Sequence, residues 1–99
     1  MIHICICDDS DAMRDELCGL IQALCQKHSI AASVSCCSSG EELLFDPDDK
    51  NRTTDIFFLD ILMKKLNGIE TAAKLRAINP TAQIIFLTVS KEHVFEALD

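Results

Sequence analysis

Acidic side chains follow two apolar runs of the sequence, at the point where each run ends. Asp8 and Asp9 come directly after residues 2–7, and Asp60 comes directly after the run at 56–59. Short apolar runs of this kind are typical of strands in a parallel sheet that is covered on both faces. Because ligands bind at the carboxyl ends of such strands, we expect these carboxylates to meet at one edge of a sheet.

Three carboxylates at one edge point to a metal and a phosphate. They would repel one another and raise their pKa values unless a cation lay between them. A site made of oxygen ligands, with open positions, suits Mg²⁺, which also accepts phosphate oxygens. A carboxylate such as Asp60 is a competent nucleophile toward a phosphoryl group, and the product is an aspartyl phosphate. Thr88 follows the apolar run at 83–87, where its hydroxyl can donate a hydrogen bond to a phosphoryl oxygen.

Each of these residues has a simpler explanation when it is taken alone. Asp8 and Asp9 can serve only as the cap of the following helix, where carboxylates suit the positive end of the helix dipole. Asp60 can begin an ordinary turn, and the Thr88 hydroxyl can bond to the backbone. Only their joint placement after three strands favours a common site.

Four apolar runs alternate with helical patterns along the chain. Asn67-Gly68 opens the third predicted helix, and Asn79-Pro80 ends it, because a proline ring cannot continue the helical hydrogen bonds. Alternating strands and helices imply an α/β fold, a doubly wound parallel sheet with helices on both faces. Strands are predicted over 2–7, 32–37, 55–59 and 83–87, and helices over 11–28, from 39–42 onward, over 68–78 and from Ser90 onward.

The first predicted helix has one apolar face, and its polar residues, among them Arg14, are assigned to the surface. Ser39 and Glu42 have the spacing of a capping box at the start of the second helix. The segment 46–52 is polar, contains a proline and predicts an exposed loop with solvated charges. The apolar face of the first helix consists of Met13, Leu17, Leu20, Ile21 and Leu24.

Composition and charge narrow the class of protein. With 99 residues the chain has room for one domain, over 1–99, and 48% hydrophobic with 25% charged residues is the balance of a globular protein. A net charge of −7 and a pI near 4.7 disfavour direct binding to nucleic acid. The sequence shows neither an export signal nor a membrane span, so we expect the cytoplasm as the compartment.

Six cysteines raise the question of disulfides or zinc. No Cys-x-x-Cys pair occurs, and the cysteines lie among apolar residues of the predicted strands and helices. We therefore expect reduced thiols that act as small buried hydrophobic side chains, with a redox or metal role as the alternative. The cysteines are Cys5, Cys7, Cys18, Cys25, Cys36 and Cys37.

These motifs together resemble the receiver domains of bacterial two-component response regulators, in particular the receivers found in front of LytTR-type DNA-binding domains. The segments 55–63 and 66–70 resemble the phosphoacceptor strand and the loop after it. The segment 4–9 resembles the first strand with its acidic pair, and 84–88 resembles the fourth strand with its switch hydroxyl. The resemblance spans nearly the whole chain and implies the flavodoxin-like receiver fold with strand order 2-1-3-4.

The resemblance implies a role for each residue of the site. Asp60 would be the phosphoacceptor for a sensor histidine kinase, and Thr88 would contact the phosphoryl group and act as the switch. Mg²⁺ would be the cofactor, held by Asp8, Asp9, Asp60 and the backbone carbonyl of Leu62. We expect a signalling protein rather than an enzyme, which controls transcription and reaches DNA only through an output domain absent from this chain.

Two features depart from the family pattern. Lys64 stands where many receivers have proline, and we expect Lys64-Lys65 to be a solvated loop pair that can attract a phosphorylated donor. Receivers also have a fifth strand, which ends in a lysine, and a fifth helix, whereas this chain ends at Asp99. We therefore expect a receiver that is incomplete at its C-terminus, with an uncovered sheet edge at which a homodimer can form.

Two other functions stay open. A receiver-like chain without that lysine could be unable to hold a phosphoryl group and act only as a protein-binding module. A metal-dependent phosphatase on a similar sheet would need a general acid near Asp60, and the next two residues, Ile61 and Leu62, are not acids.

Overall fold

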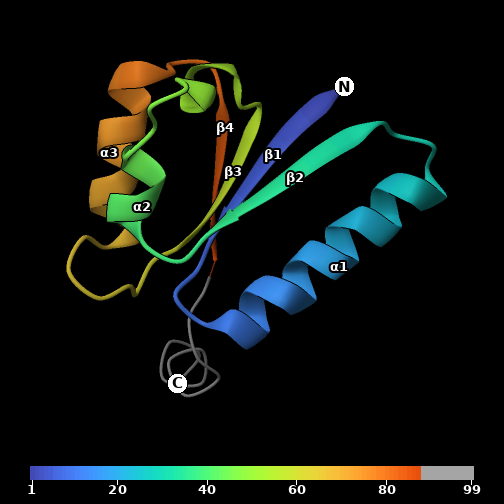
Figure 1. Cartoon of the computed structure of the whole chain (residues 1–99), viewed down its shortest axis with the longest axis horizontal. Helices are drawn as coiled ribbons and strands as arrows, with labels where there is room; N and C mark the ends of the chain where they lie inside the picture. The colour runs from blue at the N-terminus through green and yellow to red at the C-terminus, as the bar shows by residue number, and fades with distance from the viewer. Residues whose placement is uncertain (88–99) are drawn as a thin grey trace, which may run out of the picture.

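The computed structural model describes residues 1–87, and its centre is one parallel sheet of four strands (Figure 1). The strands are β1 (Ile2–Cys7), β2 (Ala32–Cys37), β3 (Ile56–Asp60) and β4 (Gln83–Leu87). Their order across the sheet is β2-β1-β3-β4, and the three neighbouring pairs are all parallel. The predicted α/β fold and its strand order are confirmed.

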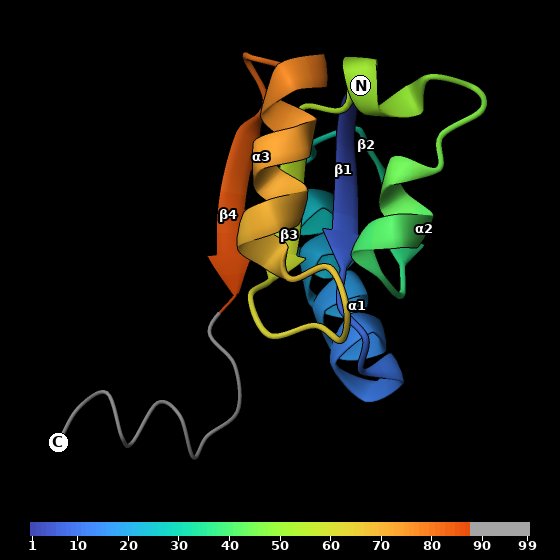
Figure 2. The same cartoon turned by 90° about the vertical axis from the view of Figure 1, so that its left-hand side faces the viewer.

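Helices cover both faces of this sheet. α1 (Asp11–Lys27) lies on one face, and α2 (Gly40–Leu44) and α3 (Gly68–Ile78) lie on the other, as Figure 1 and Figure 2 show from two directions. A short 3-10 helix, η1 (Lys50–Thr53), leads into β3. The helix predicted from Ser90 onward lies outside the described residues. Within residues 1–87, none of the helices combines the length and the apolar character that a membrane span requires.

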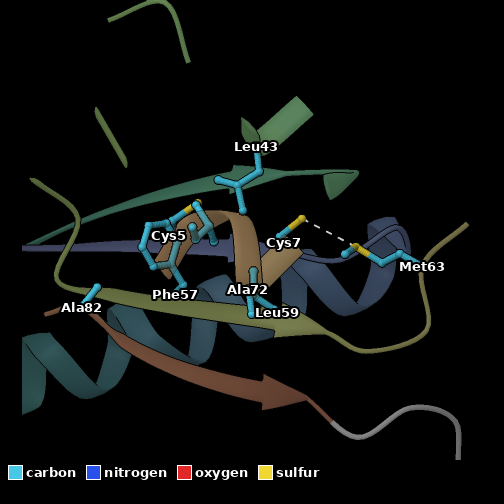
Figure 3. Packing of buried hydrophobic residues seen from close by; sticks show 9 residues of the cluster. Cys5, Cys7, Leu43, Phe57, Leu59, Met63, Ala72 and Ala82 are labelled. Atoms are coloured by element: carbon cyan, nitrogen blue, oxygen red, sulfur yellow. Dashed lines mark hydrogen bonds between the residues drawn. The ribbon is translucent and has the colours of Figure 1, made fainter. Parts of the chain in front are cut away.

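The residues of β1 alternate between the two faces, and each face has its own core. Ile4 and Ile6 pack with Ile21 of α1, whereas Cys5 and Cys7 point to the opposite side. Because β1 and β3 are largely buried on both faces, they read as continuous apolar runs in the sequence. The core on the side of α2 and α3 consists of Cys5, Cys7, Leu43, Phe57, Leu59, Met63, Ala72, Leu75 and Ala82 (Figure 3).

α1 has the predicted apolar face, but that face is only partly buried. Ile21 is buried, whereas Leu20 is 55% exposed and Met13 and Leu24 are each 47% exposed. The helix packs on β1 and β2, and the apolar residues near its start border an open hollow of about 260 Å³ that Leu87 of β4 also lines. Periodicity thus shows which side of the helix is apolar, and the neighbouring elements decide how much of it is covered.

β4 is an edge strand in the described part of the chain, where it pairs with β3 alone. Ile85 and Phe86 are 43% and 40% exposed. The prediction of a buried strand over 83–87 is therefore wrong for these side chains, because burial on both faces requires neighbours that β4 lacks among residues 1–87. An exposed and uncharged edge of this kind can pair with another strand.

The polar segment after α2, which was expected to be an exposed loop, is held by hydrogen bonds. The Asp46 carboxylate accepts bonds from the backbone amides of Lys50 and Asn51. Asn51 is 4% exposed, and its Nδ2 donates to the Leu43 carbonyl at 2.7 Å. The Asn79 side chain, at the end of α3, donates to the Asn51 carbonyl at 2.9 Å. The prediction of a solvated loop is wrong for Asn51, which ties η1 to α2 and α3.

Side chains cap the starts of α2 and α3. Ser39 accepts a hydrogen bond from the Glu42 amide at 3.0 Å, as the sequence predicts. The Glu42 carboxylate, however, accepts bonds from Ser38 instead of Ser39, so the predicted capping box is only half formed. Asn67 and Glu70 make a complete capping box at α3. These local bonds fix where the helices begin beside the carboxyl edge of the sheet.

Close packing at the start of α3 leads to a prediction about Gly68. A β-carbon added there would lie 2.3 Å from the Asp60 carbonyl oxygen, so Gly68→Ala should lower the free energy of unfolding by roughly 1–3 kcal/mol. Urea denaturation followed by circular dichroism measures the difference between this variant and the parent chain.

Gly19→Ala is the matched control, because a β-carbon at Gly19 has nothing within 4 Å. Gly19 lies inside α1, where alanine is more favourable than glycine by about 1 kcal/mol, so this variant should be at least as stable as the parent. A Gly68→Ala midpoint at or above the parent's would contradict the close approach of α3 to β3.

Candidate functional site

The structure brings Asp8, Asp9 and Asp60 together at one edge of the sheet. β1 and β3 are neighbours, and Cys7 pairs with Leu59 in their register, so the next residues on the two strands are Asp8 and Asp60. One carboxylate oxygen of each acidic residue lies within 4.8 Å of the other two. Asp60 is the last residue of β3 rather than the first residue after it. The site is therefore built directly on the ends of the central strands.

Asp8 is buried and fixed by its neighbours. The residue is 5% exposed, and its amide donates to the Cys37 carbonyl at the end of β2 at 3.1 Å. Its Oδ1 accepts a hydrogen bond from the Ser10 amide at 2.9 Å. The N-cap of α1 is Ser10, whose hydroxyl accepts a bond from the Met13 amide at 3.3 Å. Because Ser10 caps the helix, the explanation of Asp8 and Asp9 as a mere helix cap is wrong.

Arg14 joins α1 to the site, although the sequence assigned it only to the helix surface. Its Nη1 donates to the Asp8 carbonyl at 2.8 Å, and its Nη2 forms an ion pair with Asp11. The Arg14 side chain is only 18% exposed, in contrast to 86% for Asp11. The three-residue spacing of Asp11 and Arg14 is the sequence signal that could have revealed the ion pair. The bond to the Asp8 carbonyl has no such signal.

Asp60 is buried, and its carboxyl group is hard to ionise. The residue is 7% exposed. Burial, together with the negative charge of Asp8, raises the pKa of Asp60 to about 6. The Leu62 amide donates to Asp60 Oδ1 at 3.2 Å and acts in the opposite direction. Because burial and like charge both disfavour the ionised form, the site favours a bound cation.

Sulfur atoms lie beside the carboxylates on the side of the core. Cys7 Sγ lies 3.6 Å from the Sδ of Met63, and both residues are buried (Figure 3). Burial raises the pKa of Cys7 to about 12, and the charges of Asp8 and Asp60 act in the same direction. Cys7 therefore stays a neutral thiol at neutral pH. Nothing in the sequence pairs Cys7 with Met63, so this contact was missed.

The loop between β3 and α3 is tied down on two sides. The Gly68 amide donates to the Ile61 carbonyl at 3.0 Å, and Glu41 of α2 accepts a bond from the Leu66 amide at 2.9 Å. Lys65 has a φ of 58°, in the left-handed region that residues other than glycine rarely adopt. The loop borders a pocket of about 290 Å³, which is lined by Asp9, Ser38, Ser39, Glu41, Met63, Lys64 and Lys65.

Of the other two predicted site residues, Leu62 lies among the described residues and Thr88 does not. Leu62 is 49% exposed, and the bond from its amide to Asp60 holds its backbone beside the carboxylates. The role of its carbonyl as a metal ligand stays a prediction. Leu87 pairs with Asp60 in the register of β3 and β4. Thr88 lies outside the described residues, so its role also stays a prediction.

The donor set fits a hard divalent cation. The three carboxylates offer oxygen atoms from two neighbouring strands, and Mg²⁺ prefers a few carboxylates combined with water and phosphate oxygens. Asp9 is exposed whereas Asp8 and Asp60 are buried, so the group opens to solvent on one side. Such a site can admit a cation and a phosphoryl group together.

Comparison with known proteins gives consistent matches. Residues 4–99 match the family model of the response regulator receiver domain. The chain is 30% identical over 101 residues to an uncharacterized response regulatory protein of Yersinia pestis, covering 100% of this chain and 39% of that protein. It is 31% identical to the transcriptional regulatory protein LnrK of Bacillus subtilis, covering 100% of this chain and 43% of LnrK. The sensory transduction protein LytT of Enterococcus faecalis is 27% identical, and the alignment covers 97% of this chain and 37% of LytT. The chain thus spans about two fifths of the length of these curated relatives.

Solved structures show the same fold. A response regulator receiver domain protein from Clostridium thermocellum aligns with a TM-score of 0.77 and 21% identity, covering 99% of this chain and 73% of that one. The response regulator protein TrrA of Thermotoga maritima, solved in complex with Mg²⁺ and BeF, aligns with a TM-score of 0.74 and 27% identity. That alignment covers 94% of this chain and 74% of TrrA.

The burial of Asp60 and the charge of Asp8 beside it predict that Asp60→Asn stabilises the metal-free chain at neutral pH. In the unfolded chain Asp60 ionises near its usual pKa of 3.8, and in the fold near 6. The stability that the protonated group contributes is therefore complete below about pH 4 and is lost as the pH rises through about 6. In urea titrations with a chelator, the variant should have the higher midpoint at about pH 7.5 and an equal midpoint near pH 4.

Asp15→Asn serves as the control, because Asp15 is an exposed carboxylate of α1. Its free energy of unfolding should stay within about 0.5 kcal/mol of the parent's at each pH. Equal stability of Asp60→Asn and the parent at neutral pH would mean that the three carboxylates do not strain the fold.

Proposed function

The chain belongs to the response regulator receiver domain family, and on this basis we propose that it accepts a phosphoryl group on Asp60 from a sensor histidine kinase. The observation that carries the proposal is the position of Asp60, a buried carboxylate within 4.8 Å of Asp8 and Asp9. A carboxylate can attack a phosphoryl group once positive charge offsets the repulsion between the two anions. The product on Asp60 is an acyl phosphate.

Asp8, Asp9 and Asp60 would hold the Mg²⁺ that this reaction requires, together with the backbone carbonyl of Leu62. The bound cation would neutralise charge on the transferring oxygens. Support comes from the raised pKa of Asp60, which burial causes first and the charge of Asp8 second, since a cation between the carboxylates would favour the ionised form. The structure of TrrA with Mg²⁺ and BeF offers further support.

In the proposed transfer, an oxygen of Asp60 bonds to phosphorus while the bond between phosphorus and the donor's imidazole nitrogen breaks. The electron pair of that bond stays on the nitrogen, and because the other ring nitrogen carries a proton, the imidazole leaves as a neutral molecule. The Leu62 amide keeps Oδ1 of Asp60 in place, which leaves Oδ2 for the attack. We assign Thr88 the contact with a phosphoryl oxygen and the role of the switch.

An anionic donor must approach a chain with a net charge of −7, so local positive charge is needed. Lys64 and Lys65 line the same pocket of about 290 Å³ as Asp9. We propose that this pair attracts the phosphorylated donor toward Asp60. The bond from the Leu66 amide to Glu41 holds the loop that carries both lysines.

We propose that the chain works in signalling in the cytoplasm and is not an enzyme. The relatives extend beyond the matched part, and two of them are named as a sensory transduction protein and a transcriptional regulatory protein. By analogy the output would be control of transcription, with DNA contacted only by a further domain of the LytTR type. The net charge of −7 supports this division, because an acidic surface repels phosphates.

Intact-protein mass after incubation with Mg²⁺ and acetyl phosphate tests the proposal. We expect the parent chain to gain about 80 Da, and we expect no gain for Asp60→Asn or in the presence of a chelator. Asp15→Asn should be phosphorylated like the parent. If the parent binds Mg²⁺ and gains no phosphoryl group, the chain acts as a protein-binding module and the proposal is wrong.

The same assay tests the lysine pair. Lys64→Glu should slow the gain of mass by roughly two- to tenfold, and added salt should reduce the difference from the parent. Lys74→Glu makes the same change of charge on the exposed side of α3 and should leave the rate close to the parent's. Equal slowing by the two variants would mean that only the net charge matters.

We propose in addition that β4, an edge strand among residues 1–87, pairs with a second copy of the chain. Ile85 and Phe86 on this strand are exposed, and an uncharged edge favours strand pairing. Light scattering at high concentration should detect a dimer, and Ile85→Lys should shift it to the monomer. A parent chain that stays monomeric would contradict this part of the proposal.

A further inference from the structure

Cys36 and Cys37 are adjacent at the end of β2, so their side chains lie on opposite faces of the sheet. Cys37 packs against the core on the side of α2 and α3. Cys36 is the register partner of Ile6, and partners in register share a face. Ile6 packs with α1, and Cys18 of that helix contacts the same core. Cys36 and Cys18 therefore lie on the same face of the sheet, in the seam where β2 meets α1.

The two thiols interact at the solvent-accessible rim of this seam. Cys36 is exposed and Cys18 is half-buried, so the prediction of a buried thiol is wrong for Cys36. Partial burial raises the pKa of Cys36 to about 11, and the nearby Cys18 thiol acts in the same direction. A second thiol pair, Cys5 with Cys37, lies deeper, since Cys5 is only 4% exposed. Dissolved oxidants therefore reach Cys36 first.

We propose that Cys18 and Cys36 form an oxidisable thiol pair, which a hydroperoxide converts into a disulfide that fastens α1 to β2. With hydrogen peroxide, one thiol becomes a sulfenic acid and water is released. The second thiol then attacks that sulfur, the S–S bond forms, and the hydroxyl group leaves as a second water. The two thiols lose two protons and two electrons, and one peroxide is reduced to two waters.

The surroundings of Cys36 make its oxidation to the sulfenic acid slow. At neutral pH the raised pKa keeps Cys36 in the thiol form, whereas the thiolate is the reactive form. The positive charge of Arg14 acts the other way, because it favours the thiolate. The pair therefore fits a response to sustained oxidant rather than rapid removal of peroxide.

A crosslink in the seam would act on the helix that follows the acidic loop. α1 begins at Asp11, directly after the segment with Asp8 and Asp9, and Arg14 in its first turn bonds to the Asp8 carbonyl. Cys18 lies one turn further along the same helix. A bond from Cys18 to β2 restrains the helix beside the site while both thiols stay outside it. This inference does not depend on the proposed phosphoryl transfer.

The test is oxidation of the native 99-residue chain with hydrogen peroxide, followed by intact-mass analysis without reductant. We expect a loss of about 2 Da, which dithiothreitol reverses. Tryptic digestion of the oxidised chain should give one species that joins the segments 15–27 and 28–50. The thermal midpoint should rise by roughly 5–10 °C on oxidation, because the crosslink constrains the unfolded chain.

Single substitutions identify the partners. Cys25→Ser is the matched control, because Cys25 is half-buried like Cys18 and lies on the same helix. Cys25→Ser and Cys37→Ser should still form the disulfide, whereas Cys18→Ser and Cys36→Ser should not, with circular dichroism showing that each variant is folded. A crosslink that persists in Cys36→Ser would overturn the proposal. A disulfide-linked dimer in place of the internal bond, or gains of about 16 Da per oxygen alone, would overturn it as well.

Discussion

Repulsion among three carboxylates is the constraint on which the rest of this structure depends. Asp8, Asp9 and Asp60 bring oxygen atoms within 4.8 Å of one another, and two of these residues are buried. The parallel sheet enforces this closeness, because β1 and β3 are neighbours that end at the same edge. Burial, together with this repulsion, raises the pKa of Asp60. Since the strands cannot separate without loss of the fold, a cation bound between the carboxylates would relieve the repulsion and stabilise the folded chain.

Most contacts around the site hold the backbone of the acidic segments, and single amide bonds occupy one oxygen each of Asp8 and Asp60. Asp8 is tied to β2 through its amide and to α1 through its carbonyl. The loop after Asp60 is tied to α2 through the Leu66 amide, so its anchor is also a backbone group. On the core side, the buried Cys7 thiol contacts the Met63 sulfur. The fold therefore holds two buried carboxylates beside an exposed one, with oxygen atoms left to accept further bonds.

Features that follow from local sequence could be predicted, and features that follow from packing could not. The start of α3 at Asn67-Gly68 rests on a short pattern, the strand order came from the family resemblance, and the acidic site follows because each carboxylate ends an apolar run. Burial depends on which elements cover a residue, so Leu20 on α1, Ile85 on β4 and Cys36 on β2 are exposed despite their apolar type. The bond of Arg14 to a backbone carbonyl was missed for a related reason, because a carbonyl carries no sequence signal.

The two faces of the sheet are packed unequally, and this makes α1 the helix most sensitive to its polar contacts. Among the described residues, the core under α2 and α3 contains nine buried residues, whereas the core under α1 contains three. Because buried apolar area is the main source of stability, the smaller core holds its helix less strongly. Directional contacts fix the start of α1 instead, through the Ser10 cap and the bond of Arg14 to the Asp8 carbonyl. Since α1 begins two residues after Asp9, these contacts also connect the helix to the acidic site.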